Sequence, residues 1–131
     1  ERPVGIAVEG SEDLYFTEVP SPGVGGAGNG VSHLDLESGV IKRLSDGEPE
    51  PTNIGLARNG DVYWTCKSAG VILRLVEETG AIEPFATGLA EPSGIAVGRR
   101  GAVYFTELPT PGVPGPAGGQ NLVSVIRGGN K

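Results

Sequence analysis

An internal repeat constrains the fold of this chain more than any other feature. Residues 3–8, 51–56 and 92–97 share the pattern Pro-x-x-Ile followed by a small and an aliphatic residue. After a turn, each is followed by an aromatic run, at residues 14–18, 62–66 and 103–107, that contains Tyr-Phe or Tyr-Trp. Six of the seven aromatic residues lie in these three dipeptides. Repetition at this spacing predicts adjacent copies of one structural unit that pack on each other.

Each copy contains further runs of strand length. A third run lies at residues 31–36, 71–75 and 122–126, and a fourth at 40–44 and 81–85, after a Ser-Gly or Thr-Gly turn. These runs are rich in β-branched and aromatic residues and are separated by Gly, Asn and Asp, as is typical of short strands. Four strands in a unit of about 40 residues indicate a β-propeller blade. We therefore predict one all-β propeller domain over residues 1–131, with antiparallel blades at about 3–50, 51–91 and 92–131.

The predicted ring is incomplete, because the three units contain four, four and three strand runs. Propellers typically close about four to eight blades, since a shorter series leaves a sheet face and an edge uncovered. We expect self-association that completes a ring, most simply a six-bladed dimer, or else that the chain is part of a longer propeller. The absence of Met, even at the first position, fits the removal of an N-terminal segment or a piece of a larger protein. A solitary monomer is the outcome that we expect least.

The composition agrees with short strands and tight turns. The chain has 23 Gly and 11 Pro among its 131 residues, and 37% of the residues are hydrophobic. This glycine and proline content also reaches the range of disordered chains, but the regular recurrence of strand runs favours a fold. The net charge of −6 argues against nucleic acid or an anionic membrane as partner. A single cysteine excludes an internal disulfide and leaves the cellular compartment open, including a secreted or periplasmic location.

The order of these motifs resembles a known family. Pro-x-Gly-Ile-Ala-Val, a turn, Tyr-Phe-Thr-Glu, a variable loop, Asn-x-Val and Thr-Gly-x-Ile together resemble the repeats of NHL-type and virginiamycin B lyase-like propellers. The resemblance to the strictosidine synthase and gluconolactonase group is looser, and all of these families form six-bladed rings. The resemblance covers almost the whole chain and implies an architecture rather than a reaction, because propellers include enzymes, lectins and scaffolds.

The resemblance also implies candidate metal ligands. Catalysis in the lyase depends on Mg²⁺, a histidine two residues before the Ile of one innermost strand, and a glutamate that closes a Thr-Glu strand. Glu18 and Glu107 match that glutamate, but the histidine position holds other residues in every unit: Val4, Thr52 and Ser93. In gluconolactonase-like propellers Glu, Asn and Asp hold a divalent metal, and Asn53, where the other units have glycine, is the best match. The resemblance therefore implies Ca²⁺ or Mg²⁺, held by Glu18, Glu107 and Asn53, as the site to test.

Glu18 and Glu107 also have a structural interpretation. A carboxylate at a strand end can bind a hard cation or act as a general base. It can equally accept backbone amides or pair with an arginine of a neighbouring blade, and that interpretation is the more common one for such charges.

Two long loops follow these glutamates and are nearly identical in pattern. Residues 19–30 and 108–120 are rich in Pro and Gly, whereas the middle unit has only residues 67–70 at this position. Proline restricts φ, so loops of this kind lose little entropy when they become ordered. We expect the two loops to form the rim of a pocket or to pack on a partner, or else to cap exposed core. The candidate ligand-binding residues in these loops are Pro22, Gly23, Pro111 and Gly112.

Three other features are assigned structural roles. Residues 23–28 match Gly-x-Gly-x-x-Gly, but a strand run rather than a helix follows, so the pyrophosphate-binding geometry is missing. His33 has no histidine or cysteine partner at metal-ligand spacing. Cys66 occupies the position of Glu18 and Glu107, beside Lys67, and we expect it to be a small buried replacement.

Two hypotheses about function follow, and neither assigns a catalytic residue. The first is a ligand- or protein-binding propeller module that uses its loop-rich face and carries no complete catalytic set. The alternative is a divalent-metal-dependent propeller hydrolase or lyase whose site is completed by another subunit or by further blades. A purely structural or storage fragment is a third, plainer possibility.

Overall fold

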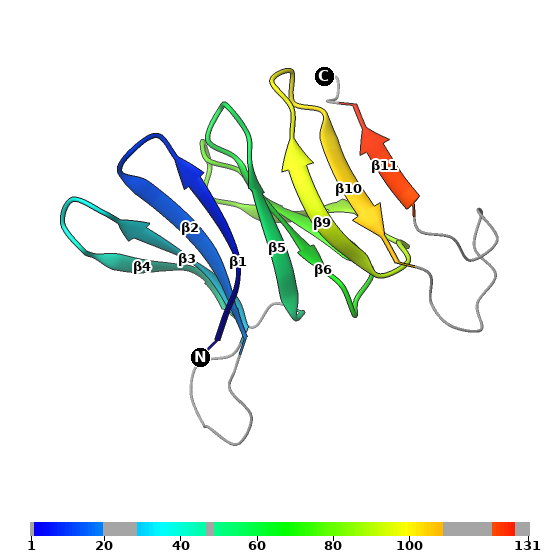
Figure 1. Cartoon of the computed structure of the whole chain (residues 1–131), viewed down its shortest axis with the longest axis horizontal. Helices are drawn as coiled ribbons and strands as arrows, with labels where there is room; N and C mark the ends of the chain where they lie inside the picture. Colours follow the sequence, from blue (N-terminus) through cyan, green and yellow to red (C-terminus); the bar gives the residue numbers. More distant parts are fainter. Residues whose placement is uncertain (1, 20–28, 47–48, 109–121, 128–131) are drawn as a thin grey trace.

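The computed structural model describes residues 2–19, 29–46, 49–108 and 122–127. These residues form three antiparallel sheets that lie side by side in an arc, with the N-terminus at one end of the arc and the C-terminus at the other (Figure 1). Blade 1 has the order β1-β2-β3-β4 and blade 2 the order β5-β6-β7-β8, while blade 3 has β9, β10 and β11, with β10 in the middle. The all-β architecture with sheets of four, four and three strands is as predicted.

The strand bounds follow the repeat units. Blade 1 consists of β1 (Arg2–Glu9), β2 (Asp13–Val19), β3 (Gly30–Asp35) and β4 (Ile41–Asp46). Blade 2 consists of β5 (Pro51–Leu56), β6 (Val62–Cys66), β7 (Val71–Leu75) and β8 (Ile82–Ala86). Blade 3 consists of β9 (Pro92–Val97), β10 (Val103–Glu107) and β11 (Leu122–Ile126). None of the described residues form a helix that is long and apolar enough to span a bilayer.

The recurring aromatic dipeptide has a direct structural explanation. Successive side chains of a strand point to opposite faces of the sheet, so the two rings of each dipeptide point toward different neighbours. In blade 2, Trp64 is buried in the core shared with blade 1, and Tyr63 is buried in the core shared with blade 3. Phe105 in turn packs in the core between blades 2 and 3. Trp64 and Phe105 therefore face the preceding blade, and Tyr15 and Tyr63 face the following one.

A threonine hydroxyl links the innermost strands of successive blades. Thr65 Oγ1 accepts the amide of Asn53 at 3.1 Å within blade 2 and donates to the carbonyl of Ser93 in blade 3 at 2.7 Å. Thr17 Oγ1 accepts the amide of Gly5 at 2.8 Å, and its contact to the Thr52 carbonyl is 3.5 Å. The amides that donate to these threonine hydroxyls lie at a β-bulge, where the inner strand departs from regular pairing. Each bulge thus leaves an amide that the threonine satisfies.

Glycine is required where two inner strands approach each other. A Cβ built on Gly5 would lie 2.8 Å from the Thr52 carbonyl oxygen and 2.9 Å from the Asn53 Cα. Both atoms belong to the backbone of the next blade, so neither can move away without separating the blades. The first glycine of Pro-x-Gly-Ile therefore allows blades 1 and 2 to pack closely along their innermost strands.

Candidate functional site

Glu107 lies at the end of β10, where its carboxylate joins three segments of the chain. Oε2 accepts the amide of Ala90, in the link between β8 and β9, at 2.8 Å. Oε1 accepts the hydroxyl of Ser124 on β11 at 3.2 Å. The backbone adds a further link, since the Leu108 amide donates to the carbonyl of Glu91 at 3.1 Å. Glu107 therefore ties the connection between blades 2 and 3 to both strands that flank the second long loop.

Glu18 occupies the same register position in blade 1. It shares the serine partner, because Ser32 and Ser124 stand at equivalent positions opposite Phe16 and Phe105, and it differs in its second partner. Its Oε2 accepts the hydroxyl of Ser32 on β3 at 2.8 Å and forms an ion pair with Arg43 on β4. Gly30 makes this pair possible, because a Cβ at that position would lie 2.5 Å from the Arg43 guanidinium. Glu18 thus links β2, β3 and β4 of its own blade at the base of the first long loop.

Asn53 lies on β5, the innermost strand of blade 2, and its side chain is partly buried. Its backbone amide is held by Thr65, and none of the described residues hydrogen-bonds its side-chain amide. Within the described ranges, no three His, Cys, Asp or Glu side chains come close enough to share a metal ion. Glu18, Asn53 and Glu107 lie on β2, β5 and β10, so each of the three blades carries one of them. The remaining predicted residues, Pro22, Gly23, Pro111 and Gly112, lie outside the described residues.

His33 and Cys66 both have positions inside blades. The His33 Nε2 atom lies 2.6 Å from Asp13 Oδ1, and its ring packs on Tyr15 with centroids 4.8 Å apart. Burial, together with the nearby carboxylates of Glu9 and Asp13, raises the pKa of Tyr15 to about 12. Cys66 is buried in the core between blades 1 and 2. Both side chains therefore contribute to packing, His33 within blade 1 and Cys66 at the junction of blades 1 and 2.

A groove of about 650 Å³ lies at the opposite end of the blades from the strand ends that lead into the long loops. It is formed where the three inner strands end and their first hairpins begin, and its charged lining residues are Glu9, Arg58 and Arg99. Arg58 and Arg99 occupy equivalent positions, two residues after the aliphatic end of β5 and β9. The strand runs alone do not predict this groove, because the two arginines lie in turns outside the runs. Aligning the turns as well as the strands would have placed them together.

The structure matches known propellers over nearly its whole length. Virginiamycin B lyase from Staphylococcus aureus gives a TM-score of 0.67 and 23% identity, covering 98% of this chain and 42% of that one. A gluconolactonase from Xanthomonas campestris gives 0.67 and 17% identity, covering 97% and 48%. An auxiliary nutrient-binding protein from Bacteroides ovatus gives 0.57 and 12% identity, covering 98% and 32%. The chain therefore spans less than half the length of each of these proteins.

These similarities confirm the β-propeller fold predicted from the repeats, of the kind found in virginiamycin B lyase and gluconolactonase. No protein-family profile matches the sequence, and no curated protein is similar to it in sequence. Because one fold is shared here by a lyase, a gluconolactonase and a nutrient-binding protein, the fold alone does not choose between catalysis and binding.

Proposed function

We propose that this chain is a ligand- or protein-binding propeller module whose binding surface is the face that carries the two long loops. The observation that carries the proposal is the bracing of the loop bases by Glu18 and Glu107. Each carboxylate accepts hydrogen bonds from the chain itself, and each lies at the strand end from which a long loop leaves. The glutamates act in this proposal as positioning residues for the loops.

Braced loop bases suit a binding surface for a physical reason. Loops set on a rigid scaffold lose less conformational freedom on binding, so more of the contact energy appears as affinity. The middle blade has no such loop and no such glutamate, since Cys66 is followed by the tight turn at residues 67–70. Its Gly70 has a φ of +66°, and a Cβ there would lie 2.5 Å from the Leu89 carbonyl oxygen. Long loop and glutamate thus occur together, in blades 1 and 3.

A loop exchange tests the binding surface. Residues 108–120 are replaced by the Lys-Ser-Ala-Gly turn of residues 67–70, and thermal melting is followed with a panel of oligosaccharides and short peptides. A ligand present at about 100 times its dissociation constant stabilises its protein by about 2.7 kcal/mol, enough to raise the melting temperature by several degrees. We expect panel members that raise the melting temperature of the intact chain to lose this effect in the exchanged variant.

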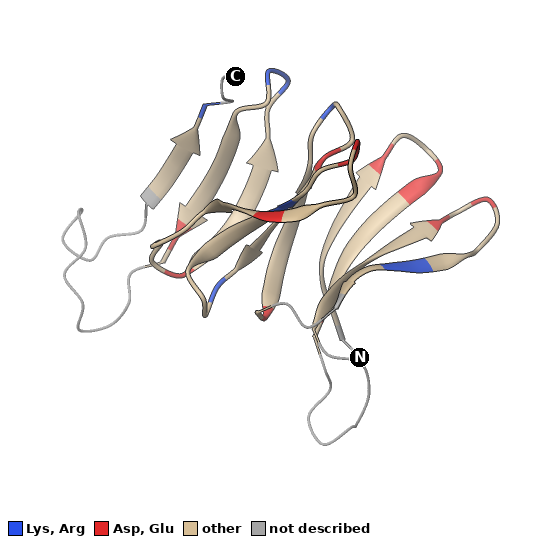
Figure 2. Cartoon of the chain, turned by 180° about the vertical axis from the view of Figure 1, so that it is seen from behind, with Lys and Arg blue, Asp and Glu red and all other residues tan. Residues whose placement is uncertain are grey.

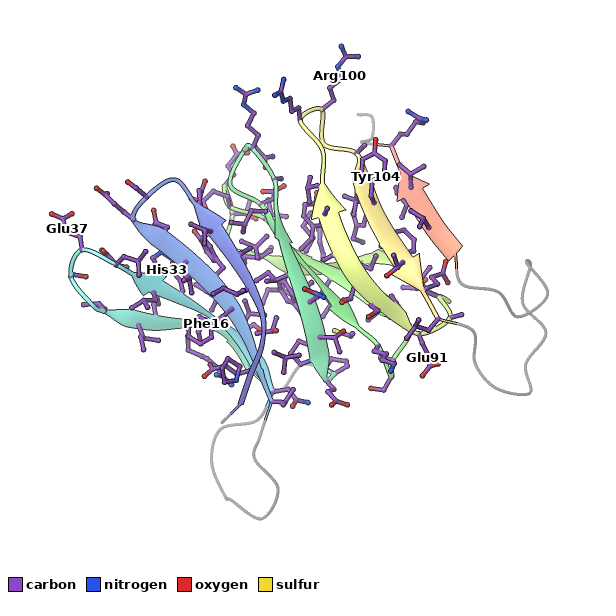
Figure 3. All side chains as sticks on the ribbon, viewed as in Figure 1. Phe16, His33, Glu37, Glu91, Arg100 and Tyr104 are labelled. Atoms are coloured by element: carbon purple, nitrogen blue, oxygen red, sulfur yellow. The ribbon has the colours of Figure 1, made fainter. Side chains whose placement is uncertain are left out.

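Glu37→Gln provides the control, because Glu37 lies at the tip of the β3–β4 hairpin, away from the strand ends that lead into the loops (Figure 3). This variant should keep every shift seen with the intact chain. Equal shifts in the intact chain and the loop-exchanged variant would move the binding surface away from the loops and contradict the proposal.

The second candidate is a divalent-metal-dependent hydrolase or lyase, and Asn53 is the observation that favours it. Asn53 replaces the glycine of the other units, and its side-chain amide is not engaged by any described residue. Calorimetric titration with Ca²⁺ and with Mg²⁺ separates the two candidates, with Asn53→Gly as the matched variant, because the other units carry Gly5 and Gly94 there. For a binding module we expect the same absence of saturable metal binding in both proteins. Saturable binding that Asn53→Gly abolishes would favour the metal-dependent enzyme.

A further inference from the structure

We propose that a second copy of this chain packs head-to-tail on the first, so that blade 3 of each copy covers blade 1 of the other and six blades close into a ring. The proposal is independent of the ligand-binding role, because it concerns the two ends of the arc and not the long loops. Phe16 on blade 1 and Tyr104 on blade 3 mark these two ends (Figure 3).

The first argument is the apolar outer face of blade 1, which consists of Ile6, Val8, Leu14, Phe16 and Leu34. Strand pairing places Ile6 opposite Phe16 in blade 1, as Ile54 stands opposite Trp64 in blade 2. Ile54 is 4% exposed because blade 1 covers it, whereas Ile6 is 63% exposed. The outer face of blade 1 therefore has the same kind of residues, in the same strand register, as the face of blade 2 that is buried against blade 1.

The second argument is the outer face of blade 3, which consists of Ala96, Tyr104, Thr106, Val123 and Val125. Val123 pairs with Thr106 in the same way that Ile72 pairs with Thr65. Ile72 is fully buried by blade 3, whereas Val123 is 77% exposed. At each junction within the chain, the Tyr-Thr face of one blade packs on the face of the next blade that carries the motif isoleucine and the Phe or Trp. The same arrangement would pack the Tyr-Thr face of blade 3 on the Ile-Phe face of blade 1 in another copy.

The third argument is the hydrogen bond between innermost strands. Thr106 Oγ1 accepts the amide of Gly94 at 2.8 Å, as Thr65 accepts that of Asn53. Thr65 also donates to the carbonyl of Ser93 in the next blade, but no described residue accepts the corresponding hydrogen of Thr106. At the other end of the arc, Val4 stands in the position of Ser93. Head-to-tail packing brings the Thr106 hydroxyl of one copy to the Val4 carbonyl of the other.

The fourth argument is charge. At the hairpin end of the blades, basic side chains lie on blade 3 and acidic ones on blade 1 (Figure 2). The basic residues are Arg99, Arg100 and Arg127, and the acidic ones are Glu9, Glu12 and Asp13. Glu9 and Asp13 lie on the side of blade 1 that points to blade 2, so the complementarity is one of the hairpin ends and not of the contacting faces. Because both groups lie at the same end of their blades, head-to-tail packing brings the basic end of blade 3 near the acidic end of blade 1. Packing blade 1 on blade 1, or blade 3 on blade 3, would set like charges together.

Light scattering after size exclusion, across a concentration series, tests the proposal. We expect a species of twice the 13.4 kDa mass of one chain. A heterologous contact that does not close produces open polymers, so a ladder of larger species would overturn ring closure. A single-chain mass at every concentration would overturn association altogether.

Two substitutions test which faces meet. We expect Ile6→Lys and Val123→Lys each to raise the dissociation constant roughly tenfold or more, because each places an unpaired charge in the junction. Both positions are exposed in the single chain, so both variants should keep the circular dichroism spectrum of the parent. A dimer that only one of the two substitutions weakens would be a face-to-face dimer of like blades and would overturn head-to-tail packing.

Ile41→Lys is the matched control. Ile41 is 61% exposed, close to the value for Ile6, and lies on the outermost strand of the same sheet. Its equivalent in blade 2, Ile82, is still 37% exposed although blade 1 packs on that sheet. Ile41 therefore lies at the rim of the same face, and Ile41→Lys should raise the dissociation constant much less than Ile6→Lys does. Equal weakening by Ile41→Lys and Ile6→Lys would indicate a general effect of surface charge and contradict the assigned contact.

Discussion

Replacing Trp64 by alanine is expected to lower the free energy of unfolding by about 3–5 kcal/mol. Trp64 is fully buried at the junction of blades 1 and 2, and it is the largest fully buried side chain among the described residues. Its removal leaves a cavity that two sheets would have to close by moving toward each other, and the Gly5 contact to the Thr52 carbonyl already holds their inner strands at close approach. Since small domains are stable by only about 5–15 kcal/mol, much of the stability would be lost. Urea denaturation monitored by circular dichroism provides the measurement.

Trp64→Phe is the control for this prediction, because the other units carry Phe16 and Phe105 at the same position. Phenylalanine removes an indole N–H that has no hydrogen-bond partner among the described residues, and this gain offsets part of the lost volume. We expect a loss of less than about 1.5 kcal/mol. A similar small loss for Trp64→Ala would show that blades 1 and 2 do not share a cooperative core.

Replacing Thr65 by valine is expected to destabilise the chain by about 2–4 kcal/mol, although the two side chains have nearly the same shape. Thr65 is fully buried, and its hydroxyl serves the Asn53 amide and the Ser93 carbonyl at once. Valine leaves both backbone groups without this partner in the interior, and each unsatisfied group costs about 1–3 kcal/mol. The same denaturation measurement applies.

Thr65→Ser separates the hydroxyl from the methyl group. Serine keeps the hydrogen-bonding oxygen and loses one buried methyl group, which is worth roughly 1 kcal/mol. We therefore expect the serine variant to be clearly more stable than the valine variant. The reverse order would mean that packing, and not the hydrogen bond between blades, is what Thr65 contributes.

The number of strands in each blade could be predicted because each strand has its own local signal. The prolines at residues 3, 51 and 92, the Tyr-Phe and Tyr-Trp pairs and the Ser-Gly and Thr-Gly turns recur in one order. A strand that begins at a proline and ends at a turn is recognisable without knowing its neighbours. The repeat also carried the assignment of the propeller fold, since four strands per unit leave few other architectures.

The second partner of each candidate glutamate could not be predicted in the same way, whereas the serine partner recurs in the repeat as Ser32 and Ser124. Glu18 and Glu107 stand in one register position and follow the same Tyr-Phe-Thr, yet one meets Arg43 of its own blade and the other an amide from the link between blades. The choice depends on whether β4 presents an arginine and whether Gly30 leaves room for it. Arg43 and Gly30 are far from Glu18 in the sequence, and only the pairing of β2, β3 and β4 brings the three residues together.

The repeat, the blades and the incomplete ring were thus determined by the sequence alone, because strand periodicity, turns and aromatic pairs are encoded within a few neighbouring residues. Only the tertiary structure shows which apolar faces are covered by a neighbouring blade and which stay exposed at the two ends of the arc. Ile6 and Ile54 lie in the same motif, but one is exposed and the other buried, because burial depends on the next blade and not on the residue itself. For the same reason only the folded chain shows what the Thr-Glu strand ends contact, namely Ser32 and Arg43 for Glu18, and Ser124 and the Ala90 amide for Glu107.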